Sequence, residues 1–357
     1  MIYRTLVRPI LFRLDPERSH ELALDCLGAL GSALSRLRQT PASPDPVLGA
    51  TVCGLRFPTV VGLAGGFDKA GRALWAWPAL GFGFVEVGTV TALPQPGNPR
   101  PRVFRFPAEE ALINRLGFNS PGSEAVASRL AAVRRSGPYP IPVGVNIGKS
   151  AIVANEDAVE DHLFSLERLH PYADFLVVNV SSPNTPDLRG LQERSALIPL
   201  MEGLSQRNRS LGEKPLFVKV APDLREPELE EIAGVLTGRA HGIVATNTTV
   251  RRNGLWGAAR IEAGGLSGRP LRALATQVIR GLWRLTGGRV PIIGVGGVFT
   301  AEDAYAKIKA GATLVELYTG FVYGGPGTPR RILAGLRRLL ARDGFRTLAQ
   351  AVGVEAS

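Results

Sequence analysis

The segment FLVVNVSSPNTPDLRG, residues 175–190, joins a strand-like run to a polar loop. Its first six residues are apolar except for Asn179, which is typical of a parallel strand buried on both faces. The loop that follows carries Ser181, Ser182 and Asn184. Parallel barrels keep their chemistry at the C-terminal ends of their strands. We therefore expect this segment to bring hydroxyl and amide groups into an active site.

Seven more strand-like runs occur along the chain, and helical patterns separate most of them. The eight runs are residues 59–65, 83–90, 142–148, 175–182, 215–222, 242–248, 291–297 and 314–320, with helical patterns at 124–133, 157–169, 226–236, 271–285 and 301–309. Eight such units predict an α/β protein with a closed (β/α)8 TIM barrel, and an open doubly wound sheet is the alternative. The long connections 91–121 and 249–267 are expected to cover the site.

The first 40 residues differ from the rest of the chain. Apolar residues recur there at helical spacing with arginines between them, and Asp15-Pro16 supplies a helix N-cap and a first-turn proline. We expect a two-helix extension over 1–40, a proline-rich linker over 41–46 and the barrel over 47–357. The extension either packs on the barrel as a plain structural element or lies in a lipid interface, with its arginines facing anionic headgroups.

Composition limits the classes of function. The chain has 357 residues, 45% of them hydrophobic, and its net charge of +11 favours anionic partners. It has no basic run with interleaved aromatic residues, so nucleic acid is not an expected partner. Two cysteines indicate no disulfide framework. No apolar run reaches the ~18 residues of a membrane span, so a soluble or peripheral protein of the cytoplasm is expected.

The predicted strand ends favour some chemistries over others. All four histidines lie elsewhere, so histidine catalysis and a histidine-bound metal are not expected. Asp68 is the main carboxylate at these ends, which argues against paired-carboxylate hydrolysis and an oxygen-bound magnesium ion. No metal site is predicted. Glycines 296–297 and residues 318–320 follow the last two runs and are typical of a barrel phosphate site, so a phosphorylated ligand or cofactor is expected.

Lys219 lies inside an apolar run, where a lysine is costly to bury without a partner. One interpretation pairs it with a neighbouring acid in the barrel interior. Another places the cation where it stabilises a delocalised anion such as a reduced flavin. A third makes it the Schiff-base lysine of a flavin-free barrel aldolase or isomerase.

Eleven motifs spread over the barrel resemble the dihydroorotate dehydrogenase family, in particular its membrane-associated, quinone-dependent class 2. They are AGGFDKAG (64–71), EVGTVT (86–91), PQPGNPRPRVFR (94–105), INRLGFNS (113–120), GVNIGKS (144–150), NVSSPNTPDLRG (179–190), VKVAPDL (218–224), ATNTT (245–249), GGLSGRPL (264–271), GVGGV (294–298) and LYTG (317–320). One departure is Asp187, where the family commonly has glycine; aspartate tolerates left-handed backbone better than most residues.

The resemblance implies a flavoprotein oxidoreductase of pyrimidine biosynthesis that oxidises dihydroorotate to orotate. FMN would contact Ala64, Gly65, Gly66, Phe67, Asp68, Thr89, Asn146, Asn179, Lys219, Thr246, Gly268, Gly297, Tyr318 and Thr319. The substrate would be held by Lys69, Asn114, Arg115, Leu116, Gly117, Phe118, Asn179, Asn184, Asn247 and Thr248.

The same resemblance makes Ser182 the catalytic base for the C5 proton. Class 1 enzymes of the cytosol have cysteine at this position, so the serine is typical of class 2. A serine hydroxyl is a poor base without a partner, so a water chain or a neighbouring hydroxyl such as Thr185 or Thr89 would carry the proton away. His20 and Arg105 would line a tunnel for a membrane quinone, and the N-terminal helices would dock on the anionic cytoplasmic face of the cell membrane. A monomer is expected. Fumarate or an NAD-linked subunit is the alternative acceptor, and a non-enzymatic membrane-binding module is a further alternative.

Overall fold

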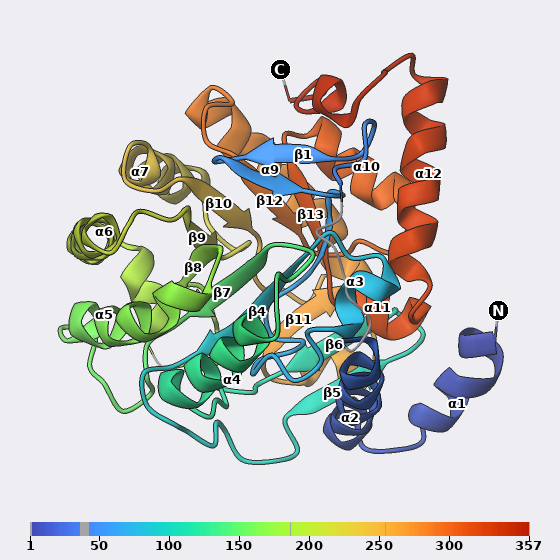
Figure 1. Cartoon of the computed structure of the whole chain (residues 1–357), viewed down its shortest axis with the longest axis horizontal. Coiled ribbons are helices and arrows are strands. Elements are labelled where there is room, and N and C mark those ends of the chain that lie inside the picture. Colours follow the sequence, from blue (N-terminus) through green and yellow to red (C-terminus); the bar gives the residue numbers. More distant parts are fainter. Residues whose placement is uncertain (1, 36–42, 186, 254, 357) are drawn as a thin grey trace.

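Eight parallel strands close into a barrel in the computed structural model, which describes residues 2–35, 43–185, 187–253 and 255–356. Their order around the barrel is β3, β4, β7, β8, β9, β10, β12, β13 (Figure 1). The bounds are β3 Val61–Leu63, β4 Phe84–Val90, β7 Val143–Ile147, β8 Phe175–Asn179, β9 Leu216–Val220, β10 Gly242–Ala245, β12 Ile292–Val295 and β13 Leu314–Leu317. Each lies within one of the predicted runs, so the closed barrel is confirmed and the open sheet is excluded.

Helices on the outside of the barrel connect the strands (Figure 1). The five predicted helices are confirmed to within two residues at each end, and α6 and α12 complete the ring. The α-helices that follow the N-terminal extension are α3 Ala76–Leu80, α4 Ser123–Arg135, α5 Ala158–Leu169, α6 Arg194–Ser210, α7 Glu226–Leu236, α8 Ala258–Ile261, α9 Arg272–Thr286, α10 Ala301–Lys309, α11 Thr319–Gly324 and α12 Thr328–Arg342. The 3-10 helices are η2 His170–Tyr172, η3 Leu188–Gln192, η4 Arg269–Leu271 and η5 Leu348–Ala351.

A short hairpin closes the N-terminal end of the barrel. Its strands are β1 Ala50–Val52 and β2 Leu55–Phe57, joined by a tight turn in which Cys53 and Gly54 both have positive φ. The ring of Phe57 packs edge-on against Phe84, with 5.3 Å between ring centroids, and it also contacts Phe175. This apolar plug leaves the opposite, C-terminal end of the barrel for the polar side chains.

The two long connections form a second sheet rather than irregular loops. Strands β5 Val103–Phe106 and β6 Ala111–Asn114 come from the first connection, and β11 Gly265–Gly268 comes from the second. The strands are antiparallel in the order β11, β6, β5. The connections lie where they were predicted, but their strands were missed, because β6 and β11 come from connections far apart in the sequence and pair with each other.

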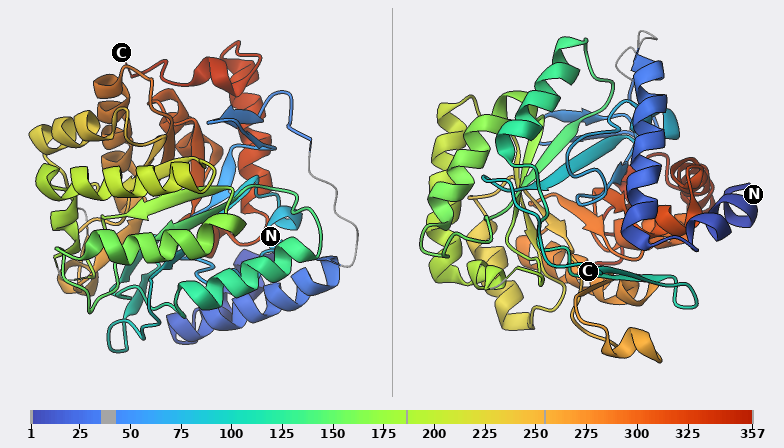
Figure 2. Two further views of the ribbon diagram at one scale, coloured as in Figure 1. Left: turned by 60° about the vertical axis from the view of Figure 1, so that its left-hand side comes forward. Right: turned by 90° about the horizontal axis from the view of Figure 1, so that it is seen from below.

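The N-terminal extension is a helical hairpin that lies against the side of the barrel, next to α3 and β5 (Figure 2). It consists of a π-helix, η1 Tyr3–Val7, followed by α1 Arg8–Leu11 and α2 Pro16–Ser35. Asp15 caps α2 as predicted, because its carboxylate accepts hydrogen bonds from the backbone N–H groups of Glu17 and Arg18 at 3.0 and 2.9 Å. Residues 36–40 of the predicted extension and 41–42 of the predicted linker lie outside the described residues. None of the described helices is long and apolar enough to span a membrane.

Candidate active site

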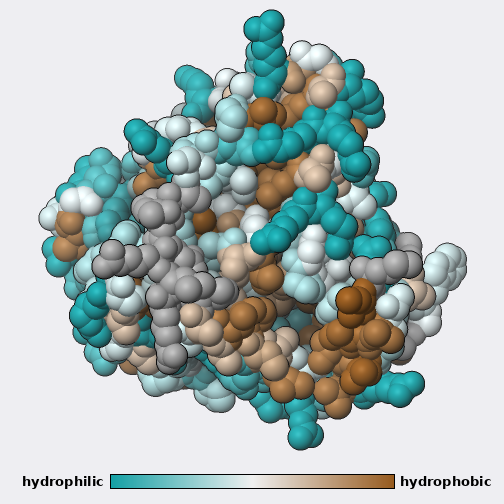
Figure 3. All heavy atoms as spheres, turned by 45° about the vertical axis from the view of Figure 1, so that its right-hand side comes forward, coloured by the Kyte–Doolittle hydropathy of each residue, from teal (hydrophilic) through white to brown (hydrophobic). Residues whose placement is uncertain are grey.

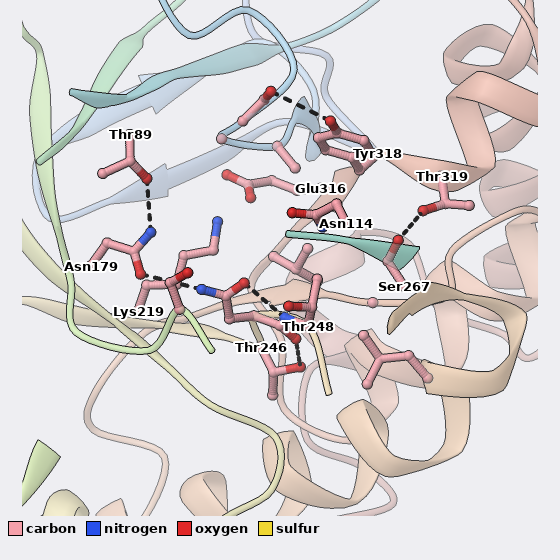
Figure 4. Close-up of a pocket in the computed structure, with 18 of the residues that line it drawn as sticks. Thr89, Asn114, Asn179, Lys219, Thr246, Thr248, Ser267, Glu316, Tyr318 and Thr319 are labelled. Atoms are coloured by element: carbon pink, nitrogen blue, oxygen red, sulfur yellow. Dashed lines mark hydrogen bonds between the residues drawn. The ribbon is translucent and has the colours of Figure 1, made fainter. Parts of the chain in front are cut away.

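A polar cavity opens at the C-terminal ends of the barrel strands, and Asn114 of β6 and Ser267 of β11 contribute to its lining (Figure 4). Most of the predicted site residues line it together: Ala64, Gly65, Gly66, Lys69, Thr89, Asn114, Leu116, Gly117, Phe118, Asn179, Ser182, Asn184, Lys219, Thr246, Asn247, Thr248, Gly268, Gly297, Tyr318 and Thr319. Sequence reasoning did not select Ser267, Leu271 or Glu316, which also line it. We call this space the polar cavity.

Four of the residues predicted to hold FMN or the substrate do not line the polar cavity. The Asp68 carboxylate accepts hydrogen bonds from the Arg72 N–H at 2.7 Å and from the Trp77 ring N–H at 3.1 Å, so it fixes the chain before α3. Arg115 forms an ion pair with Glu262. Phe67 lies in the wall of a second cavity, and Asn146 is fully buried beneath the site. Contacts of Asp68 and Arg115 with a ligand in the polar cavity would therefore come from their backbone.

Amide side chains in the polar cavity hold one another in place. The Asn179 side-chain amide donates a hydrogen bond to the Thr89 hydroxyl at 2.8 Å. The Asn247 side-chain amide donates to the side-chain oxygen of Asn179 at 3.2 Å. Asn184 donates to the side-chain oxygen of Asn114 at 3.2 Å. These bonds fix the orientation of the remaining donors and acceptors before a ligand arrives, which lowers the entropic cost of binding a planar polar ring.

Ser182 lies on the loop after β8 and is 6% exposed. Its hydroxyl oxygen accepts a hydrogen bond from the Asn184 N–H at 3.3 Å, which leaves the hydroxyl hydrogen free to point elsewhere. The nearby Thr185 hydroxyl is buried and has no partner in the described part of the chain. None of the four histidines lines the polar cavity. Asp187, at the far side of this loop, has a φ of 53°, as expected for a residue at a glycine position.

Lys69 lies where the polar cavity meets a second cavity. Its ammonium group donates to the side-chain oxygen of Asn119. Burial and, after it, the nearby positive charge of Arg102 lower the pKa of Lys69 to about 7, against the opposing effect of the Glu17 and Glu21 carboxylates. An anionic group placed beside this lysine would favour its charged form.

Buried carboxylates accompany Lys219, which corrects the prediction that acids are scarce at the site. The Lys219 ammonium group donates to Glu86 Oε1 at 2.9 Å, and Glu316 is the acid that lines the polar cavity. Burial alone would lower the pKa of Lys219, but Glu86 and Glu316 together raise it above its usual value. A Schiff-base lysine needs a neutral amine, so this pairing argues against the aldolase alternative. Glu86 and Glu316 also lie inside apolar runs, and the burial argument used for Lys219 identifies them equally well.

A second cavity of about 730 Å³ lies between the hairpin and the barrel, and we call it the apolar cavity. Its lining includes Leu11, Phe12, Leu22, Leu24, Leu27, Phe67, Val103, Leu112, Phe321 and Val322. His20 also lines it and packs edge-on against Phe67, and burial lowers the pKa of His20, which favours the neutral ring. Figure 3 shows hydrophobic side chains gathered over the hairpin at the lower right. Among the residues of the helical hairpin, Ile2, Leu6 and Ile10 are exposed.

Arg105 lies on β5 and lines the apolar cavity, where its side chain contacts the helical hairpin. Its guanidinium donates to the Leu11 carbonyl oxygen at 3.0 Å and to the Leu14 carbonyl oxygen, and it lies over the Phe12 ring at 4.6 Å. The bonds to the turn between α1 and α2 explain how the hairpin keeps its angle to the barrel. The two cavities share Gly66, Lys69, Leu116 and Tyr318 in their linings, so they meet at these residues.

Comparison with known proteins agrees with this architecture. The family model described as dihydroorotate dehydrogenase matches residues 47–340. A dihydroorotate dehydrogenase (quinone) of Anaeromyxobacter dehalogenans is 55% identical over 353 residues, which cover 98% of this chain and 96% of that protein. One of Chloroflexus aurantiacus is 51% identical over 348 residues, covering 93% and 95%. The crystal structure of the Eimeria tenella enzyme in complex with ferulenol has a TM-score of 0.87 at 39% identity, covering 94% of this chain and 95% of that one. The chain belongs to the dihydroorotate dehydrogenase family.

Proposed function

We propose that the protein oxidises dihydroorotate to orotate in the polar cavity, with FMN as its cofactor, and that a quinone reaches the cofactor through the apolar cavity. The observation that carries this proposal is the meeting of the two cavities at Gly66, Lys69, Leu116 and Tyr318. One cavity presents amides, hydroxyls and lysines to a small polar ring. The other presents apolar side chains to a lipid-soluble ring.

The residues at and beneath the base of the polar cavity fit FMN. Lys219 lines the cavity as a cation, and Asn146, which lies beneath it, has a buried side-chain oxygen without a partner among the described residues. At Gly297, φ is 70° and an added Cβ would lie 2.5 Å from Arg272, so only glycine allows this close backbone turn at a phosphate. Thr319 supplies a hydroxyl on the same side, 2.8 Å from Ser267. Bound FMN supplies a two-electron acceptor for the hydrogen at C6 of dihydroorotate.

The other groups bind the substrate and move its proton. Asn114, Asn184 and Asn247 match the ring N–H and C=O groups of a pyrimidine, and the Lys69 ammonium group matches its carboxylate. Ser182 takes the proton from C5. The buried, unpartnered Thr185 hydroxyl is the first acceptor of the relay that carries the proton away. Most of these side chains are held by one another before binding, so ordering them adds little entropic cost to substrate binding.

The hairpin would serve as the contact with the membrane that holds the quinone. Ile2, Leu6 and Ile10 lie along the segment that contains η1 and α1 and are 71%, 63% and 63% exposed, and the arginines between them can face anionic headgroups. This arrangement supports a peripheral protein on the cytoplasmic face of the cell membrane, with its apolar cavity open toward the lipid.

An absorption spectrum and a comparison of acceptors test the proposed function. We expect the purified protein to be yellow and dihydroorotate to bleach it without oxygen. A soluble quinone should then restore the colour at least about tenfold faster than fumarate or NAD, because the apolar cavity favours an apolar acceptor. Stopped-flow absorbance measures both steps. A colourless protein, or faster reoxidation by fumarate, would contradict the proposal.

The affinity for orotate should fall as pH rises above about 7. The pKa of Lys69 is about 7 in the empty site, so the ammonium form that binds the carboxylate is present below this pH and is lost above it. The dissociation constant should increase by about tenfold per pH unit between pH 7 and pH 8.5, measured from the flavin spectrum during titration. Lys69→Arg keeps its charge over this range, so its binding should be weaker at pH 7 but independent of pH. An unchanged dissociation constant for the wild type would refute this role of Lys69.

A further inference from the structure

Arg189 lies in η3, at the C-terminal end of the loop that carries Ser182, and the proposed mechanism gives it no part. Its side chain is half-buried. The guanidinium Nε donates a hydrogen bond to the carbonyl oxygen of Ser181, eight residues earlier in the chain, at 3.1 Å. Because Ser181 directly precedes Ser182, this bond ties the start of the loop to its end. The backbone on both sides of Ser182 is thus fixed by one side chain.

The same guanidinium also holds the loop that follows β10. Its Nη2 donates to the carbonyl oxygen of Thr248 at 3.0 Å. Thr248 and its neighbour Asn247 line the polar cavity, and the Thr248 N–H donates to the side-chain oxygen of Asn247 at 2.8 Å. A guanidinium is planar and presents its donors in fixed directions. Arg189 therefore sets the spacing between the loop that carries Ser182 and the loop that carries Asn247.

Asp223, in the loop that follows β9, fixes the orientation of the guanidinium. Its Oδ2 forms an ion pair with Arg189 Nη1 at 2.9 Å, and the Asp223 side chain is only 13% exposed. The same oxygen accepts the Val250 N–H at 3.1 Å, and Oδ1 accepts the Thr249 hydroxyl. Hydrogen bonds between charged groups are the strong ones, and partial burial protects this pair from solvent. The loops that follow β8, β9 and β10 therefore meet at one ion pair.

We propose that Arg189 is a positioning residue, which holds Ser182 at the distance from the substrate ring that proton transfer from C5 requires. Arg189 does not line the polar cavity, so it acts through the backbone of the two loops and not by touching the substrate. A misplacement of about 1 Å can slow a reaction by about 100-fold, whereas orotate binding is shared among several amides and Lys69. Loss of the guanidinium should therefore impair reduction more than binding. This inference rests on the proposed role of Ser182 as the base.

Arg189→Lys separates the two effects. It keeps a positive charge beside Asp223, but an ammonium group on a flexible stem cannot hold both carbonyl oxygens as the planar fork does. The limiting rate of flavin reduction at saturating dihydroorotate should fall by about tenfold or more, while the dissociation constant of orotate should rise by less than about threefold. Anaerobic stopped flow measures the rate, and titration of the flavin spectrum measures orotate binding.

Arg251 supplies the matched control. It pairs with the same carboxylate, with 3.6 Å between its Nε and Asp223 Oδ1, and its side chain is 45% exposed. None of its hydrogen bonds among the described residues reaches Ser181 or Thr248. Arg251→Lys should therefore leave the reduction rate and the dissociation constant within about twofold of wild type, as expected for an exposed ion pair.

A double substitution shows whether Arg189 acts through Ser182. In Ser182→Ala, the further change Arg189→Lys should slow the residual reduction by less than about threefold, because the group that it positions is absent. Equal losses in both backgrounds, or a wild-type rate in Arg189→Lys, would overturn the proposal. If Arg189→Lys does not fold, Asp223→Asn decides the question: it removes the ion pair at constant size and should slow reduction by about threefold or more, and an unchanged rate would overturn the proposal. Near-normal reduction in Ser182→Ala would instead contradict the proposed function.

Discussion

Replacing Ser182 with alanine should slow flavin reduction by dihydroorotate by about 10²- to 10⁴-fold, the usual contribution of a positioned general base. The hydroxyl is 6% exposed and accepts only the Asn184 N–H, so its removal leaves no large cavity and breaks one weak bond. Orotate should still bind within about threefold of wild type, because the amides and Lys69 that hold it are unchanged. Anaerobic stopped flow measures the reduction rate, and titration of the flavin spectrum measures orotate binding.

The neighbouring serine is the matched control for this substitution. Ser181 donates to the Asn179 carbonyl oxygen at 3.1 Å and accepts from Asn247 at 3.0 Å, so it supports the amides but does not line the polar cavity. Ser181→Ala should slow reduction by less than about tenfold, because its two hydrogen bonds hold Asn179 and Asn247 in place and its hydroxyl does not line the polar cavity. Near-normal reduction in Ser182→Ala, or an equal loss in both variants, would show that Ser182 is not the base.

Thr185→Val tests the proton relay. This variant should slow flavin reduction, and the loss should be greatest at low pH.

The barrel was predictable because each of its strands can be recognised from the residues of that strand and its immediate neighbours. Each run is short, apolar and bounded by polar or glycine-rich residues, and the polar residues fall at the same place in successive units. The β5–β6–β11 sheet was not predictable in the same way. Its strand β11, Gly265–Gly268, contains two glycines and pairs with β6 from the other long connection, so its formation depends on tertiary contacts that no local pattern contains.

The features of the site were also predictable only where they depend on local sequence. The position of Ser182, Asn184 and Lys219 followed from strand ends and burial cost, and these residues do line one cavity. The partners of Lys219 did not follow, because the pairing of Glu86 with Lys219 depends on which strands face each other across the barrel. The contact between the polar and apolar cavities depends on the angle of the hairpin. That angle is fixed by Arg105 and by the buried ion pair of Glu17 with Arg102, at 2.7 Å.

Deleting residues 1–40 should lower quinone-dependent turnover by about 100-fold or more and leave flavin reduction by dihydroorotate within about threefold of wild type. The hairpin supplies one wall of the apolar cavity, including Leu11, Leu24 and His20, so its removal leaves no enclosed apolar path to the cofactor. The residues predicted to hold FMN and the substrate all lie in the barrel, after residue 63. Stopped flow measures each half-reaction separately, and a retained flavin spectrum shows that the truncated barrel is folded.

A matched variant separates the cavity from the membrane contact. Replacing Ile2, Leu6 and Ile10 with serine removes exposed apolar side chains without changing the lining of the apolar cavity. Turnover with a soluble quinone should stay within about twofold of wild type, whereas turnover with a long-chain quinone in anionic vesicles should fall by about tenfold or more, because lipid insertion of the hairpin is weakened. Equal losses with both acceptors in the serine variant would mean that the exposed face acts through the apolar cavity. In the chain without residues 1–40, unchanged quinone kinetics would show that the hairpin is not part of the quinone path.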